Sequence, residues 1–130
     1  MSVKRHETPL IALLSVGWEQ DDWQTFRDGN GFRWHVVEVG PTKRQAREIW
    51  LSDAIAAVVF VGRGEAVDRA IDLLHLLRGT GPPVVIAIAD PVDVRTEKLL
   101  RQTGAIYLCG AEAQQRLADV LREMLCHSAS

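Results

Sequence analysis

The sequence predicts an α/β fold, in which one doubly wound, five-stranded parallel sheet carries helices on both faces. Short apolar runs alternate with segments of helical periodicity, and the connections between them are short. Most of the runs are also apolar without interruption, which is typical of strands covered on both faces. The five predicted strands are Leu10–Val16, Trp34–Val39, Ala56–Val61, Val84–Ala89 and Ala105–Cys109.

The first half of the chain also contains two candidate helices. Residues 19–27 can form a short helix that the turn sequence Asp28-Gly29-Asn30-Gly31 would end. Polar and apolar residues alternate in the following strand, Trp34–Val39, which indicates a position near an edge of the sheet. Thr42 is the expected N-cap of a helix that continues to about Leu51.

The second half contains three more predicted helices. The segment Glu65–Arg78 has apolar residues at helical spacing, and its expected inward face is Val67, Ile71, Leu74 and Leu77 or Arg78. The next helix begins with Asp90 as N-cap and Pro91 at the first helical position, and it ends at Gly104. The last helix covers Ala111–Leu125, with an inward face of Leu117, Val120, Leu121 and Met124.

Strict strand–helix alternation with short connections predicts right-handed crossovers. Five such units match the strand order 2-1-3-4-5 of flavodoxin-like folds. We expect one domain over residues 9–126, with tails at 1–8 and 127–130, because the chain has 130 residues and no repeat or linker.

Composition excludes several classes of function. The net charge is −2 and the pI is near 6.1, so bulk charge attracts neither nucleic acid nor an anionic membrane. No apolar run is long enough to span a bilayer, and the N-terminal residues lack the apolar core of a signal peptide, so we expect a cytoplasmic protein. Cys109 and Cys126 do not form a disulfide framework, and Cys109 is expected to be a buried apolar residue.

The carboxyl ends of the predicted strands carry few reactive groups. Parallel sheets place their chemistry in the crevice outside these ends. Here the five strands end in Ser15-Val16-Gly17, Val39-Gly40, Val61-Gly62, Ile88-Ala89 and Cys109-Gly110, and Asp90 is the nearest carboxylate. A scaffold without reactive groups at this edge indicates a domain that acts by contact.

The C-terminal half resembles the receiver domain of two-component response regulators. The resemblance covers Pro83–Leu125, while the N-terminal half matches only in the order of its elements. Its motifs are the strand Pro83-Val84-Val85-Ile86-Ala87-Ile88-Ala89-Asp90, the turn Thr103-Gly104-Ala105, the strand Tyr107-Leu108-Cys109-Gly110 and the helical segment Leu117-Ala118-Asp119-Val120-Leu121.

Receivers carry an acidic pair after the first strand, a phospho-accepting aspartate after the third, a hydroxyl residue after the fourth and a lysine after the fifth. The carboxylates hold Mg²⁺, while the lysine and the hydroxyl bind the phosphoryl oxygens. This sequence has Ser15-Val16-Gly17 at the acidic pair, Val61 or Gly62 at the acceptor, Ile88 at the hydroxyl and Gly110 at the lysine. The resemblance therefore implies a pseudo-receiver with no phospho-acceptor, catalytic residue, metal or cofactor.

The resemblance also implies an interaction surface. Tyr107 lies three residues before the vacant lysine position, where receivers carry an aromatic residue that belongs to a dimerisation or docking surface. That surface would include Arg95, Lys98, Arg101, Tyr107 and Gln114. Its partner would be a protein: a second copy, a kinase or a transcription-regulator module. Tyr107 can equally be a packed strand residue with its hydroxyl at the rim.

Other residues allow a functional and a structural interpretation. The pair Asp21-Asp22 could be a displaced Mg²⁺ site or the solvated first turn of a helix, and we favour the helix. Gly62-Arg63-Gly64 could bind an anion or simply turn the chain, and we favour the turn. The four histidines lack metal-ligand spacing. The four tryptophans, Trp18, Trp23, Trp34 and Trp50, could form a contact patch or fill the core.

Two classes of function are therefore expected. The first is a phosphorylation-independent regulatory domain that binds protein and is not an enzyme. The second is a flavodoxin-like domain or enzyme that binds a nucleotide, a flavin or an anion at the loops 17–22, 62–65 and 90–93. Direct binding to nucleic acid is disfavoured because the chain shows no helix-turn-helix segment and no basic face.

Overall fold

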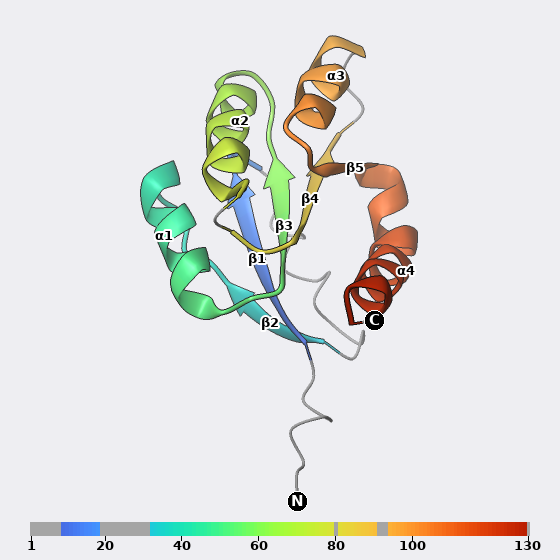
Figure 1. Ribbon diagram of the computed structural model, residues 1–130. Helices are drawn as coiled ribbons and strands as arrows, with labels where there is room; N and C mark the ends of the chain where they lie inside the picture. The colour runs from blue at the N-terminus through green and yellow to red at the C-terminus, as the bar shows by residue number, and fades with distance from the viewer. Residues whose placement is uncertain (1–8, 19–31, 80, 91–93, 130) are drawn as a thin grey trace, which may run out of the picture.

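A computed structural model describes residues 9–18, 32–79, 81–90 and 94–129, and for residues 111, 114 and 125–129 it describes the backbone alone (Figure 1). The predicted helix at 19–27, the pair Asp21-Asp22 and residues 1–8 lie outside the described residues.

The strands form one parallel sheet in the order β2-β1-β3-β4-β5, which confirms the predicted flavodoxin-like order 2-1-3-4-5. The register places Val16 beside Val61 and Val61 beside Ala89, so three strands end level with one another. The strand bounds are β1 Leu10–Val16, β2 Arg33–Val36, β3 Ala56–Val61, β4 Val84–Ala89 and β5 Ile106–Cys109.

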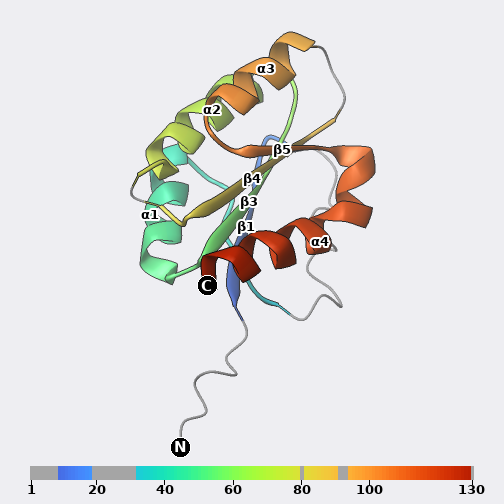
Figure 2. The same ribbon diagram turned by 45° about the vertical axis from the view of Figure 1, so that its right-hand side comes forward.

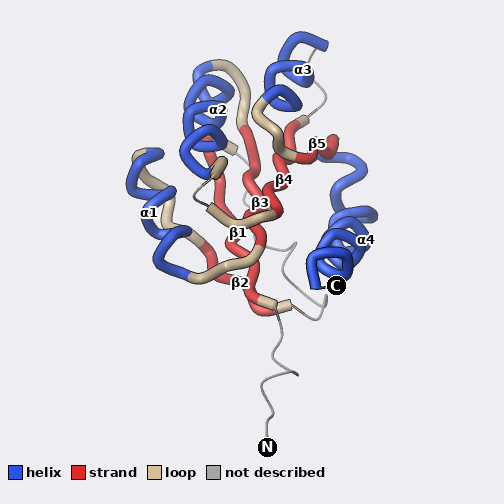
Figure 3. Tube along the Cα trace, in the orientation of Figure 1, coloured by secondary structure: helices blue, strands red, loops and turns tan. Residues whose placement is uncertain are grey.

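Helices cover the sheet on both faces. Figures 1 and 2 show α1, α2 and α3 on one side and α4 on the other, and Figure 3 shows the strands between these two layers. Among the described residues, no helix combines the length and the apolarity that crossing a bilayer requires. The helix bounds are α1 Thr42–Ser52, α2 Glu65–Leu77, α3 Val94–Gln102 and α4 Gly110–Ala129.

The core has two halves because successive strand side chains point to opposite faces. Ala12, Leu14 and Val16 of β1 face the α1–α2–α3 layer. Ile11 and Leu13 face the opposite layer, where α4 contributes its buried apolar residues. The α4 residues in this second half are Ala113, Leu117 and Leu121, with Val120 partly buried.

The edge strand β2 is shorter than predicted. Carbonyl groups of β1 alternate between its two neighbours, and that of Leu13 accepts the N–H of Val37 at 2.8 Å. The next carbonyl on this side belongs to Ser15, and it accepts from the side-chain amide of Gln45 at 3.0 Å instead of from Val39. Val39 is consequently exposed, and the prediction that the strand reaches it is wrong.

Several predicted helix details also differ. Pro41 occupies the N-cap of α1, so Thr42 is the first helical residue and makes no cap. The buried face of α2 is Ala66, Ala70, Leu73, Leu74 and Leu77, which leaves Val67 and Ile71 only partly buried. Ala66 and Ala70 are buried in the core, and a Cβ atom at Gly17 would lie 2.5 Å from that of Ala66, so this face of α2 packs against the end of β1. Met124 is exposed rather than inward, and α4 continues past Leu125 to Ala129.

Candidate functional site

The carboxyl ends of β1 and β3 meet in a main-chain contact at the position where a receiver holds its phospho-acceptor. Val61, one candidate for that position, is buried between Val16 and Ala89 in the sheet. The other candidate, Gly62, donates its N–H to the carbonyl of Val16 at 2.8 Å. A Cβ atom at Gly62 would overlap the carbonyl group of Gly17. Any side chain is therefore excluded at Gly62 unless the turn after β1 moves.

Two polar contacts hold the turn that stands where the acidic pair would be. Ser15 is buried, and its Oγ accepts from the backbone N–H of Trp18 at 3.1 Å. Gln45 is buried on α1 and donates from Nε2 to the carbonyl of Ser15. Gly17 has a φ of +71°, and a Cβ atom there would lie 2.5 Å from the Cβ of Ala66. This turn has no carboxylate and no room for one at Gly17.

The Trp18 side chain lies over this edge of the sheet. Its indole meets the Phe60 ring edge-to-face, with the ring centroids 5.3 Å apart. A Cβ atom at Gly110, the vacant lysine position, would lie 3.4 Å from Cη2 of Trp18 and 3.0 Å from Oδ1 of Asp90. The indole thus extends from Phe60 of β3 to Gly110 at the start of α4. Ile88, at the hydroxyl position, is fully buried.

Arg63 and Asp90 are opposite charges at the same edge. The Arg63 guanidinium lies 3.7 Å from a carboxylate oxygen of Asp90, and the arginine side chain is 70% exposed. A pair this long and this exposed contributes little to stability. Among the residues that the structure describes, no three His, Cys, Asp or Glu side chains gather as a metal site. Arg63 therefore faces a carboxylate, which weakens its interpretation as part of an anion site.

The second candidate site is the surface formed by α3, β5 and α4, named here the α3–β5–α4 surface. The guanidinium carbon of Arg101 lies 5.2 Å from the ring centroid of Tyr107, within cation–π range. Arg101 also donates from Nε to Glu97 at 2.8 Å. Burial raises the pKa of the Tyr107 hydroxyl, Cys109 and Glu97 raise it further, and Arg101 opposes them. The hydroxyl therefore stays protonated at neutral pH and can both donate and accept a hydrogen bond.

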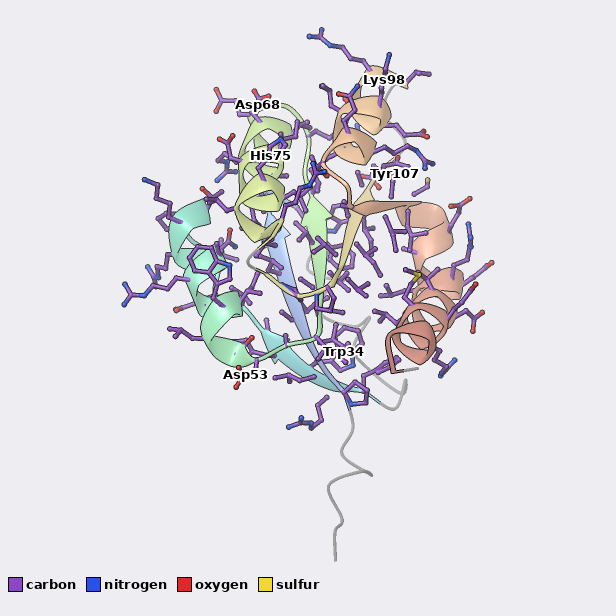
Figure 4. All side chains as sticks on the ribbon, in the orientation of Figure 1. Trp34, Asp53, Asp68, His75, Lys98 and Tyr107 are labelled. Carbon is purple, nitrogen blue, oxygen red and sulfur yellow. The ribbon has the colours of Figure 1, made fainter. Side chains whose placement is uncertain are left out.

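The other predicted surface residues are distributed along α3 and α4. Arg95 and Lys98 are exposed, and no described carboxylate lies within ion-pair distance of either. Figure 4 shows Lys98 in the middle of α3, above Tyr107 on β5 in this view. Gln114 lies on α4, but its side chain is outside the described residues. The structure thus brings Arg101 and Tyr107 together and leaves Arg95 and Lys98 open to solvent.

Sequence reasoning missed Gln45, Glu97 and Val94, and it named Trp18 without placing it at this edge of the sheet. Gln45 and Trp18 shape the turn and the edge at the carboxyl ends of β1 and β3. The only sequence signal for Gln45 was a polar residue on an apolar helix face, and the only signal for Trp18 was a tryptophan soon after a strand. Glu97, four residues before Arg101, was visible as a helical ion pair. Val94 is 82% exposed at the start of α3 and adds an apolar contact point.

No family model matches the sequence, and a search of curated proteins finds no match. Solved structures do match, and they include receiver domains. A CheY-like response regulator receiver domain protein from Methanospirillum hungatei has a TM-score of 0.68 at 11% identity, covering 93% of this chain and 96% of that one. A CheY-like response regulator from Mesorhizobium loti has a TM-score of 0.60 at 14% identity, covering 89% and 98%.

A protein of different function has a similar fold. A cobalamin-binding protein from Desulfitobacterium hafniense matches with a TM-score of 0.64 at 18% identity and covers 84% of this chain. The match spans only 57% of the length of that protein. At these identities the likenesses show the fold alone, so the chain is a flavodoxin-like domain of receiver-like architecture.

Proposed function

We propose that this chain is a phosphorylation-independent, receiver-like regulatory domain that acts by binding protein. The main-chain contact between Gly62 and Gly17 carries the proposal, because it excludes an acceptor side chain at the position where receivers need one. Trp18 over Phe60 and the glycine at 110 support it, since an indole lies at this edge of the sheet and the position where receivers carry a lysine has no side chain. Receiver domains among the similar structures support the regulatory class.

Phosphorylation is tested by intact-mass spectrometry after incubation with acetyl phosphate and Mg²⁺. We expect no change in mass, beside a conventional receiver that gains one phosphoryl group under the same conditions. A phosphoryl group mapped to Asp21, Asp22 or Asp90 would contradict the proposal, because it would reveal a rearranged but active acceptor.

The partner is proposed to bind the α3–β5–α4 surface. Arg101 is already oriented by Glu97 and Tyr107, so it needs little further ordering to bind a carboxylate on a partner. Lys98 and Arg95 add two cations without carboxylate partners among the described residues. An acidic protein surface therefore fits best, on a kinase or a transcription-regulator module.

Charge reversal on α3 tests this surface. A Lys98→Glu, Arg101→Glu variant should lose the acidic partner protein that the wild-type chain retains at low salt, while Arg69→Glu on α2 should retain it. Equal retention by both variants would place the binding surface elsewhere. All three substitutions are at exposed helix positions, and circular dichroism verifies that both variants are folded.

A cobalamin-binding protein of similar fold favours a second candidate function, the binding of a small ligand at the loops 17–22, 62–65 and 90–93. The position of Trp18 opposes it, because the indole occupies the edge between Phe60 and Gly110. Equilibrium dialysis with cobalamin, flavin mononucleotide and ATP separates the two functions. Saturable binding that Trp18→Ala alters would support the second function and contradict action by contact alone.

A further inference from the structure

Helix α1 presents a basic stripe to solvent. Lys43, Arg44 and Arg47 are exposed, and the first turn holds no acidic residue. Arg44 pairs with Glu38 at 3.2 Å, between two well-exposed side chains. Lys43 and Arg47 have no carboxylate partner among the described residues. The exposed outer side of α1 is therefore positive over its N-terminal half.

Helix α2 presents an acidic stripe beside it. Glu65, Asp68 and Asp72 are exposed, and none of them forms an ion pair with a described residue. Figure 4 shows Asp68 at the outer side of α2, with its side chain directed away from the sheet. Figures 1 and 2 show α1 and α2 side by side in one layer, and the two helices pack against each other. Two neighbouring helices thus carry opposite charge on one face.

The two stripes have the same spacing. On α1 the residues Lys43, Arg47 and Trp50 follow one another at i, i+4 and i+7. On α2 the residues Asp68, Asp72 and His75 follow at the same intervals. Each stripe ends in an aromatic ring near the C-terminal end of its helix. Trp50 is 42% exposed and its neighbour Leu51 is 74% exposed, so α1 also ends in an apolar contact area.

We propose that this face, named here the α1–α2 face, binds a second copy of the chain. Both helices return from one edge of a parallel sheet to the other, so they point in the same direction. A two-fold axis parallel to the helices then lays α1 of each copy on α2 of the other. The basic stripe of each copy, which contains Lys43 and Arg47, would face the acidic stripe of the other, which contains Asp68 and Asp72.

Charge complementarity favours a second copy over other occupants. An acidic partner, a nucleic acid or an anionic membrane would be attracted by α1 but repelled by Asp68 and Asp72 of the adjacent α2. A uniformly basic partner would be attracted by α2 but repelled by Lys43 and Arg47 of α1. A rotated second copy of the chain places an acidic stripe opposite each basic stripe, so Lys43, Arg47, Asp68 and Asp72 all face opposite charge. This interface is separate from the α3–β5–α4 surface and does not depend on the proposed function.

Paired charge-reversal variants test the proposal by sedimentation equilibrium at low salt. The first variant, Lys43→Glu with Arg47→Glu, places two acidic stripes face to face. The second variant, Asp68→Lys with Asp72→Lys, places two basic stripes face to face. Each should weaken dimerisation at least about tenfold, because like charges then oppose each other in both halves of the interface. Circular dichroism verifies that both variants remain folded.

Mixing the two variants is the decisive measurement. In a mixed dimer the acidic α1 of the first variant meets the basic α2 of the second, and the remaining pair is wild type. An equimolar mixture should therefore dimerise about as strongly as wild type, and added salt should weaken it. A wild type that stays monomeric, or a mixture that does not associate, overturns the proposal. Lys98→Glu with Arg101→Glu should dimerise normally, which separates this proposal from the function of the other surface.

Discussion

Replacing Gly62 by alanine adds one methyl group where the structure has no space for it. The new Cβ atom would overlap the carbonyl group of Gly17 and lie 3.1 Å from the backbone nitrogen of Trp18. Overpacking costs about 1–3 kcal/mol, and main chain yields less easily than a flexible side chain, so about 3 kcal/mol is expected. Reduced freedom of the unfolded chain returns about 0.4–1 kcal/mol. The free energy of unfolding should fall by about 2–3 kcal/mol, which follows from these two figures.

Thermal unfolding followed by circular dichroism measures this loss. For a chain of this size 1 kcal/mol corresponds to about 4 °C, so Gly62→Ala should lower Tm by about 8–12 °C. Gly40→Ala is the matched control, because a Cβ atom there would lie 3.7 Å from Nη1 of Arg44, an ordinary contact. The control should leave Tm unchanged or raise it by up to about 4 °C. Equal Tm values for the two variants would refute the steric account of the vacant acceptor position.

Three further predictions concern single side chains. Trp18→Ala removes the indole over Phe60 and should lower the free energy of unfolding, measured by urea denaturation, by about 2–4 kcal/mol. Trp18→Phe keeps an aromatic ring and should lose clearly less. Equal losses for the two variants would show that the aromatic contact is unimportant. Gln45→Ala leaves the Ser15 carbonyl without its donor and should cost about 1–3 kcal/mol, whereas a loss below about 0.5 kcal/mol would mean that water replaces the amide. Tyr107 is the single tyrosine of the chain, so ultraviolet titration reports it alone, and burial raises its pKa above the ordinary value of 10.0. Because the pKa of Tyr107 is higher in the folded than in the unfolded state, its contribution to stability is intact below pH 10.0 and is lost as the pH rises through the folded pKa. A titration midpoint of the folded protein below 10.0 would reject the raised pKa.

The sheet and its strand order were predictable because they depend on patterns that the chain repeats. Ala56–Val61 and Val84–Ala89 are uninterrupted apolar runs between clear turn residues, and both strands have these bounds in the structure. Details set by a single long-range contact were not predictable. The early end of β2 depends on Gln45, which is 30 residues from Ser15 in the sequence. Such a hydrogen bond leaves no periodic signal in the sequence.

The vacant acceptor position also combines a feature that the sequence predicts with one that only the structure shows. Alignment with the receiver pattern predicts that Val61 or Gly62 lacks a carboxylate. Only the structure shows that Gly62 lies against the Gly17 carbonyl, because this contact joins loops from two different strands. Composition also gave no sign that Trp18, rather than another tryptophan, would cover this edge. On the second site, the cation–π contact between Arg101 and Tyr107 depends on how α3 docks beside β5.

The amide of Gln45 also limits how far the sheet can grow. It occupies the Ser15 carbonyl to which a longer β2 would bond, so the chain leaves the sheet after four strand residues. At the other edge β5 also has four residues. Very short edge strands are poor templates for adding another chain edge-to-edge. The hydrogen bond from Gln45 to Ser15 thereby disfavours strand-by-strand aggregation at the β2 edge.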